Sequence, residues 1–347
     1  MFCREARPQI HTLGTSRGGR PSTVEGMEQP LAIYRASSLR DAGRSGAAMR
    51  RRAAGDGPDR LVRVGPNAFV RGVDWDAAGP RQQYVTRVFA RLGRRSTAAA
   101  GSHVSAVAAH GLPWLAGWPE DVHITVPKSQ YGARTKSLVL HTRPLGSKDL
   151  VHHGGVRFTT VARTVADIAL LGDVRATVVV ADAAIRSGVP KQACTAALGG
   201  TLHDRGRRLA VLALDIADGR SGSPAESLAR VVFRELGLPV PVLQQRFVVE
   251  GRRYEVDFWF PEQGVVVEMD GHAKYTQERY RNGRDTTQVF IDEKRRHEQL
   301  LTVPGVRVIL RLEWRDLWDL DRLTRRLRAA GLPCAVRPVR SARDVAR

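Results

Sequence analysis

The sequence predicts an α/β (α+β) multidomain protein, and three observations lead to that fold class. The chain has 347 residues, which corresponds to two or three domains of about 100–200 residues each. Hydrophobic residues make up 42% of the sequence, enough to build real cores, and this argues against global disorder. Runs with helical spacing alternate with β-prone runs along the chain, so both kinds of element are expected in the domains.

The charge balance favours a polyanionic partner. The sequence holds 55 Lys and Arg against 35 Asp and Glu, a formal net charge of +20. Such a surface attracts nucleic acid at long range, although high-GC coding would also enrich a sequence in arginine.

The cysteines and the hydropathy of the sequence argue against several classes of protein. Cys3, Cys194 and Cys334 lie far apart and form no CxxC pair, which argues against a disulfide scaffold or a structural zinc site and fits a reducing cytoplasm. No apolar run approaches the ~20 residues that span a bilayer, and the N-terminus lacks an apolar signal core. We therefore expect a cytoplasmic protein with no membrane partner, whose translation starts at Met1 or Met27.

Residues 30–72 have the layout of a winged helix. Two short helical patterns, broken at Gly43, precede two β-prone runs around Gly65-Pro66-Asn67. In this layout the second helix enters the DNA major groove. The alternative is a basic solvated helix that fills no groove. The arginines expected to contact DNA are Arg44, Arg50, Arg51 and Arg52.

The next region predicts a mixed α/β domain. We expect strands at 122–127, 137–142 and 156–158, and helices at 105–110, 164–171, 175–187 and 191–198. His103 and His110 lie at the start and end of a short helix, where histidines more often pack or cap than act as ligands.

Four ordered motifs in this chain resemble a known family. They are SHVSAVAAHGL (102–112), VHITVP (122–127), VRFTTVARTVADIAL (156–170) and VVADAAIRSG (179–188). Together with the winged-helix pattern they are similar to the AbiEi family of antitoxins from type IV toxin–antitoxin systems, over about residues 30–200. The resemblance implies a transcriptional autoregulator with a possible cognate toxin as partner.

The C-terminal third predicts a helix followed by an acidic hairpin. Ser223, Pro224 and Glu226 form a helix start, so Glu226 can also be interpreted simply as an acid that complements the helix dipole. A four-residue turn at 261–264 would pair Phe260 with Val265. Asp257 would then lie opposite Glu268, with their Cβ atoms ~4.5–5.5 Å apart, and Asp270 would share the face of Glu268.

Three acids on one face favour a metal site. Like charges opposite each other destabilise a hairpin, and a divalent cation removes that cost. Oxygen ligands suit Mg²⁺ or Mn²⁺, so we expect Asp257, Glu268 and Asp270 to ligate one of these ions. The alternative is a solvated acidic face relieved by nearby arginines.

This order of acids resembles the signature of PD-(D/E)XK nucleases. The signature is an acid on the first helix, then Asp, a hairpin turn and Glu-x-Lys. The region is most similar to the Vsr-like (very-short-patch-repair) domain, which carries Glu-x-Asp-Gly followed by Lys274-Tyr275, a helix like DEKRRHEQLL (292–301) and a strand like VRVILRLEWRDL (306–317). The resemblance implies a restriction-endonuclease-like core. Asp270 stands where the signature has lysine, so Lys274 or Lys294 would supply the positive charge, and His272 is a weaker candidate for general base.

Six segments follow from these patterns. We expect a disordered tail (1–29), a winged-helix domain (30–72), an AbiEi-like mixed α/β domain (80–200), a linker region (201–222), a Vsr-like nuclease domain (223–331) and a second disordered tail (332–347).

The resemblance implies a metal-dependent DNA endonuclease that its own winged helix targets. Asp257 and Glu268 would ligate the metal, and Asp270 would add a ligand or position water. Glu226 would make an outer contact, while Arg296 and Arg311 would hold the DNA backbone. The alternative is an antitoxin-like DNA-binding regulator with a degenerate nuclease domain. An RNA substrate is less favoured, because no aromatic stacking platform like that of an RNA-recognition motif is apparent; the oligomeric state is left open.

Overall fold

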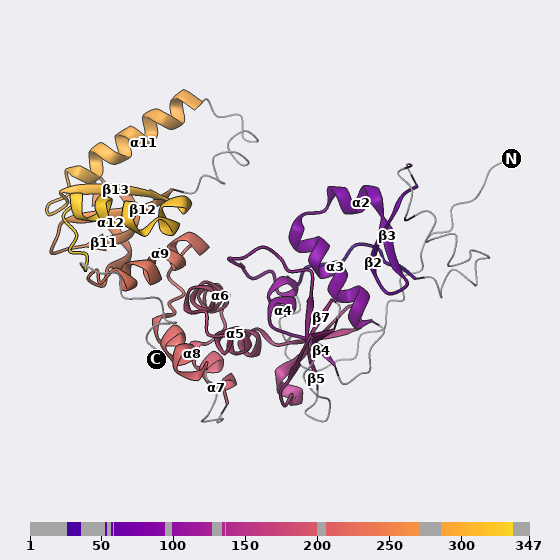
Figure 1. Ribbon diagram of the computed structural model, residues 1–347. Helices are drawn as coiled ribbons and strands as arrows, with labels where there is room; N and C mark the ends of the chain where they lie inside the picture. The colour runs from indigo at the N-terminus through magenta and orange to yellow at the C-terminus, as the bar shows by residue number, and fades with distance from the viewer. Residues whose placement is uncertain are drawn as a thin grey trace.

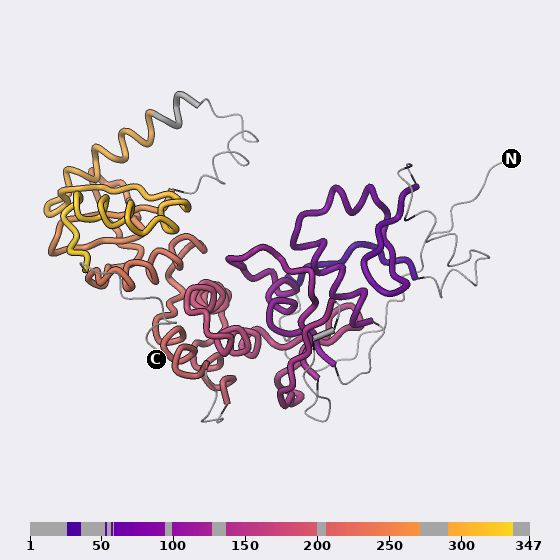
Figure 2. The backbone as a smooth tube through the Cα atoms, in the orientation of Figure 1, coloured from indigo at the N-terminus to yellow at the C-terminus, as the bar shows by residue number. Residues whose placement is uncertain are grey.

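The computed structural model describes residues 26–35, 53, 57, 59–93, 99–126, 134–135, 137–199, 206–270 and 286–335. Three β-sheets and several helices alternate through these residues (Figures 1 and 2). The prediction of a mixed α/β multidomain fold is therefore confirmed. None of the described helices is both long and apolar enough to cross a membrane.

The N-terminal sheet is small and antiparallel, with the strand order β1-β3-β2. Its strands are β1 (Tyr34–Arg35), β2 (Leu61–Gly65) and β3 (Ala68–Arg71). The predicted hairpin is confirmed: Asn67 adopts a φ of 53° between β2 and β3, a left-handed value that asparagine tolerates better than most residues. The two predicted helices before this hairpin, with Arg44, Arg50, Arg51 and Arg52, lie outside the described residues.

Helix α3 (Pro80–Leu92) joins the N-terminal sheet to the middle region. Ala90 packs against Val64, Ala68 and Val70 of the small sheet, while Tyr84 and other α3 residues belong to the large middle core. Helix α3 therefore contributes to the cores on both sides of the predicted boundary between residues 72 and 80, where α2 (Gly72–Ala77) lies.

The middle region is a six-stranded mixed sheet with the order β6-β7-β5-β4-β9-β8, followed by helices. The strands are β4 (Ala100–Gly101), β5 (Val122–Val126), β6 (Arg134–Thr135), β7 (Leu138–Thr142), β8 (Leu150–His153) and β9 (Val156–Thr159). The helices are α4 (Val104–Ala109), α5 (Val161–Ala169), α6 (Val174–Arg186), α7 (Lys191–Ala197) and α8 (Arg207–Ile216). All three strands and four helices expected here are present, with ends shifted by a few residues.

The expected linker at 201–222 differs from the structure. Its central part forms α8, in which Ala210, Ala213 and Leu214 are buried. The apolar spacing of these residues places one helix face against the helical core. This part of the segment is a structural element, because burying that face stabilises the folded chain.

Both expected tails also contain ordered residues. Met27 is buried in the middle core, and the N–H of Glu28 donates to the carbonyl of Ala109 at 2.8 Å. At the other end Leu332 is buried, and the N–H of Ala335 donates to the carbonyl of Leu236 at 2.8 Å. The ordered parts therefore begin before residue 30 and extend past residue 331.

The C-terminal region is a four-stranded sheet covered on both faces. Its strands follow the order β10-β11-β12-β13, and β12 and β13 are parallel. The elements in chain order are α9 (Pro224–Glu235), β10 (Val242–Val249), β11 (Arg252–Phe260), β12 (Val265–Asp270), α11 (Thr286–Leu301), β13 (Val308–Glu313), the 3₁₀ turn η2 (Trp314–Trp318) and α12 (Leu320–Ala329). Helices α9 and α12 share one core with the sheet, and Leu300 of α11 belongs to a second core.

Helix α9 connects this sheet to the middle helices. Val231 of α9 packs with Val174 and Val178 of α6. Two ion pairs flank that contact: Arg175 with Glu235, and Arg230 with the fully buried Asp182 at 2.7 Å. The C-terminal sheet and the helices α5–α8 are neighbours in Figure 1, joined through α9.

Candidate active site

The hairpin β11–β12 brings two predicted acids together. Phe260 lies opposite Val265 and Phe258 opposite Val267, as the sequence predicted. Asp257 and Glu268 are the next residues on the two strands. At this point the Asp257 carboxylate accepts a hydrogen bond from the N–H of Met269 at 2.7 Å, so this side chain takes up a backbone donor of β12.

At Asp257, the alternate residues of β11 switch from one face of the sheet to the other. Alternate residues of a strand normally share a face, yet Val256 packs in the core beneath α11 and Phe258 in the core beneath α9 and α12. On the neighbouring strand Gln244 has a φ of 51°, which is uncommon for a residue other than glycine. At this position the Asp257 carboxylate is reached by Met269 of β12 and by Gln244 of β10.

Glu226 approaches Asp257 from the start of α9. Ser223 caps this helix, and its Oγ accepts from the N–H of Glu226 at 3.2 Å. The buried Glu226 carboxylate accepts from the N–H of Gly222 at 2.6 Å and from Nε2 of Gln244 at 2.8 Å. The same Nε2 lies 3.4 Å from Oδ1 of Asp257. Gln244 therefore bridges the two acids, a role that its sequence position gave no reason to expect.

The surroundings of Asp257 disfavour its ionised form relative to that of an ordinary aspartate. Burial, followed by the nearby Glu226 and Glu268 carboxylates, raises the pKa of Asp257 to about 6. The hydrogen bonds from Met269 and Gln244 act in the opposite direction. Asp257 is therefore still ionised at pH 7, but at a higher cost in free energy than an ordinary aspartate, and a bound positive charge would offset that cost.

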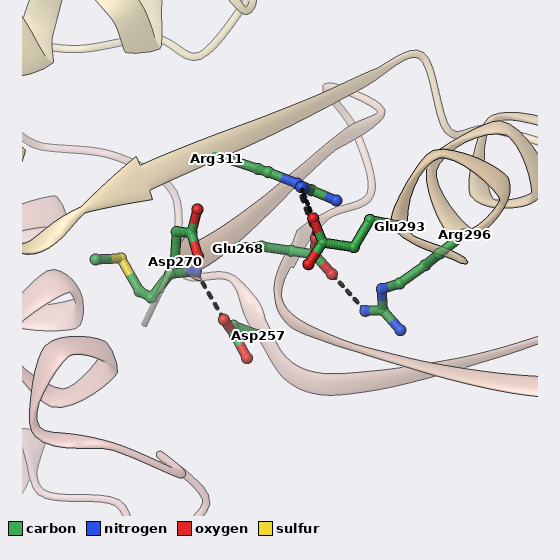
Figure 3. Close-up of a pocket in the computed structure, with 7 residues that line it drawn as sticks. Asp257, Glu268, Asp270, Glu293, Arg296 and Arg311 are labelled. Carbon is green, nitrogen blue, oxygen red and sulfur yellow. Dashed lines mark hydrogen bonds and ion pairs between the residues drawn. The ribbon is translucent and has the colours of Figure 1, made fainter. Parts of the chain in front are cut away.

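An open cavity of about 250 Å³ adjoins these groups. Figure 3 shows its acids, Asp257, Glu268, Asp270 and Glu293, together with two arginines. The structure therefore brings the three predicted metal ligands to one cavity. Glu293 was not predicted, although it precedes Arg296 by three residues on α11 and so faces the same side of the helix.

Both predicted phosphate-contacting arginines of this domain are in the cavity wall (Figure 3). Arg296 of α11 forms an ion pair with Glu268 at 2.5 Å. Arg311 of β13 lies 3.8 Å from Glu268 and 3.5 Å from Glu293. Glu268 is thus paired with two guanidinium groups.

Of the two predicted lysines, Lys294 is not among the described residues that line this cavity. Lys294 lies 3.9 Å from Glu298, and its side chain is 69% exposed. It lines an adjoining depression with His297 and with Glu293 and Arg311, which the two hollows share. Lys274 and the weaker candidate His272 lie outside the described residues.

No family model, curated protein or solved structure matches this chain. The geometry and chemistry of the cavity therefore have to support any functional assignment.

The donor set fits a hard divalent cation with few protein ligands. Among the described residues, no group of three or more His, Cys, Asp or Glu side chains is arranged to hold a metal ion, so the three-carboxylate ligand set stays a prediction. Mg²⁺ often takes only one or two carboxylates and completes its shell with water and substrate phosphate. Asp257 and Glu268 supply that number, and the raised pKa of Asp257 shows that added positive charge would be favourable.

A histidine cluster lies elsewhere, in the middle region. The rings of His103 and His141 stack at 3.5 Å, and Nδ1 of His123 is 3.0 Å from Nε2 of His141. Burial holds the pKa of His103 well below its usual value and lowers that of His141 to about 4. These two rings are neutral at pH 7 and pack together, as the sequence suggested for His103; the partnership with His123 and His141 was not foreseen.

Proposed function

We propose that this protein is a metal-dependent DNA endonuclease whose C-terminal region hydrolyses phosphodiester bonds. The observation that carries the proposal is the position of Asp257 between Glu226 and Glu268, with a pKa raised to about 6. Concentrating acids in this way destabilises the apo protein, and perturbed carboxylates in a cavity mark candidate functional sites. A divalent cation is the partner that relieves this repulsion.

The predicted acids have distinct roles in this proposal. Asp257 and Glu268 hold Mg²⁺ or Mn²⁺, and Asp270 adds a ligand or positions water. When bound, the cation lowers the pKa of a water molecule and offsets charge on the phosphate. Glu226 acts through Gln244, which keeps the Asp257 carboxylate oriented.

The order of elements supports a PD-(D/E)XK-like, Vsr-like core. An acid on α9 precedes Asp257 on β11, a tight turn and Glu268 on β12. This is the order of acids in the signature that the sequence resembles. Asp270 still occupies the position of the signature lysine, and the described positive charges in the cavity wall are Arg296 and Arg311. We assign phosphate contact to these two arginines.

The N-terminal region would deliver the enzyme to DNA. The β2–β3 hairpin has the position of a wing after the basic segment with Arg44, Arg50, Arg51 and Arg52. With a net charge of +20, the chain would associate with DNA rapidly and in a salt-dependent manner.

A regulator without catalysis is the second candidate. It is favoured by the ion pairs of Glu268 with Arg296 and Arg311, which already neutralise the carboxylate, and by Asp270 in place of lysine. In this case the protein would bind DNA as an antitoxin-like repressor with a cognate toxin as partner.

Cleavage of supercoiled and linear DNA with Mg²⁺ or Mn²⁺ separates the two candidates. Nicking that requires the metal and is abolished by Asp257→Ala and by Glu268→Ala establishes the endonuclease. A protein that shifts DNA in a gel but leaves it intact under all metal conditions is the regulator.

A further inference from the structure

Glu268 presents both of its carboxylate oxygens to arginine. Oε1 pairs with Nη2 of Arg296 at 2.5 Å, and Oε2 faces Nε of Arg311 at 3.8 Å. The Glu268 side chain is only 14% exposed, so water screens these pairs weakly. The two arginines come from α11 and β13 and meet at Glu268 on β12 (Figure 3).

A cation and these guanidinium groups compete for the same atoms. Mg²⁺ needs carboxylate oxygens at about 2.0–2.1 Å in nearly ideal octahedral geometry. An oxygen that already accepts a strong charge-assisted hydrogen bond is a poorer ligand, and two positive charges beside it repel a third.

Both arginines have second anchors that would hold them in place after they leave Glu268. Nη2 of Arg296 also donates to the carbonyl of Glu255 at 2.7 Å, and its guanidinium lies 5.8 Å from the ring centre of Tyr254. Arg311 lies 3.5 Å from Glu293. Displaced from Glu268, each guanidinium would stay at the cavity wall.

We infer that Arg296 and Arg311 form a cation-released guanidinium pair: without metal they occupy Glu268, and cation binding frees them to contact a DNA phosphate beside the same carboxylate. This inference rests on the proposed function, because it takes Glu268 as a metal ligand. In this inference the ion pairs of Glu268 couple cation binding to DNA binding. They are therefore compatible with an active site.

The coupling has a required thermodynamic form. If the cation raises the affinity for DNA by some factor, DNA must raise the affinity for the cation by the same factor. Without DNA, substitution of Arg296 should tighten cation binding, because a competitor for Glu268 is removed. The same substitution should weaken DNA binding and reduce the coupling factor.

Equilibrium titration of the full chain with Mn²⁺, followed by electron paramagnetic resonance without DNA, tests the inference. Arg296→Gln should bind Mn²⁺ about tenfold more tightly than the wild type, the order of one charge-assisted hydrogen bond. Arg246→Gln is the matched control. It also removes one positive charge from the same sheet, but Arg246 is 76% exposed and pairs with Glu255. The control should stay within about twofold of the wild type.

Arg311→Gln guards against misfolding of a single variant, and thermal melting of each variant checks the fold. Arg311→Gln should raise the affinity for Mn²⁺, as Arg296→Gln does, but by a smaller factor, because Arg311 lies farther from Glu268.

Two further variants separate failure of this inference from failure of the proposed function. If Glu268→Gln and Asp257→Asn abolish Mn²⁺ binding while folded Arg296→Gln and Arg311→Gln bind no more tightly than the wild type, the coupling is wrong and the metal centre stands. If Mn²⁺ binding is the same in all variants, both are overturned. Tighter binding in Arg296→Gln that Glu268→Gln abolishes supports the inference whether or not the protein cleaves DNA.

Discussion

Asp257 accepts a 2.7 Å hydrogen bond from the backbone N–H of Met269, at the point where the β11–β12 ladder ends. The bond fixes one carboxylate oxygen of Asp257 against β12, and the charges of Glu226 on α9 and Glu268 on β12 still act on the side chain. An acid held here by a backbone donor is in place before any cation arrives. Preorganisation of this kind is what an enzyme site requires.

The first prediction concerns the pH dependence of stability. Because the pKa of Asp257 is raised to about 6, the folded state binds more protons than the unfolded state between about pH 4 and 6. Stability therefore falls as the pH rises through this window. Asp257→Asn, which keeps an oxygen acceptor for Met269, should be more stable than the wild type at pH 8 by about 1–3 kcal/mol. Near pH 4 the difference should vanish.

Chemical denaturation at the two pH values measures this difference. Glu262→Gln is the control, because Glu262 is an exposed acid in the turn of the same hairpin. Added Mn²⁺ should stabilise the wild type and not Asp257→Asn. Equal stability of wild type and Asp257→Asn at pH 8 would contradict the electrostatic account.

The second prediction concerns Gln244. Its amide lies between Glu226 and Asp257, so Gln244→Glu would place a third carboxylate where a donor is needed. We expect the free energy of unfolding to fall by about 1–3 kcal/mol at pH 8, and by less near pH 4, where Asp257 is protonated. Thermal melting checks this against Gln245→Glu on the same strand. Similar losses in the two variants would show that Gln244 is not the bridge described here.

The third prediction concerns the contact between α6 and α9. Asp182 is fully buried and pairs with Arg230 at 2.7 Å, so Arg230→Gln leaves a buried carboxylate without its cation. We expect the free energy of unfolding to fall by about 3–5 kcal/mol. Arg220→Gln removes a 63% exposed partner of Asp218 and should cost less than about 1 kcal/mol. If denaturant titrations give both variants the same small loss, the buried pair does not hold these helices together.

The fourth prediction concerns the basic segment before the N-terminal hairpin. Replacing Arg50, Arg51 and Arg52 with Gln should weaken DNA binding and reduce the slope of log affinity against log salt by roughly 0.9 for each phosphate that the protein no longer neutralises. Fluorescence anisotropy at several salt concentrations measures the slope. Arg246, Arg252 and Arg253 are exposed, and replacing these three with Gln gives the charge-matched control. A similar reduction in both triple variants would show that the charge acts without a specific binding segment.

Local rules were enough to predict the hairpin and its acids from the sequence. A four-residue turn fixes register, so Phe260 opposite Val265 places Asp257 next to Glu268. The capping pattern at Ser223 likewise predicted where α9 begins and where Glu226 lies.

Contacts between distant segments could not be predicted in this way. Arg296 and Arg311 were expected to face DNA, and their pairing with Glu268 depends on how α11 and β13 pack against β12. The bridge by Gln244 depends on a left-handed φ that no sequence rule assigns to glutamine. The burial of α8 within an expected linker depends on α6, whose apolar face needed a partner.

The rate of metal-dependent nicking of supercoiled DNA, compared between the wild type and Asp257→Asn, tests the central claim most directly. Asp257→Asn keeps the shape of the side chain and the acceptor for Met269 but removes the negative charge. The account predicts nicking by the wild type with Mg²⁺ or Mn²⁺, none with a chelator, and a loss of at least about a hundredfold in the variant. Equal nicking rates in the two proteins, or no metal-dependent nicking by a wild type that binds DNA, would contradict it.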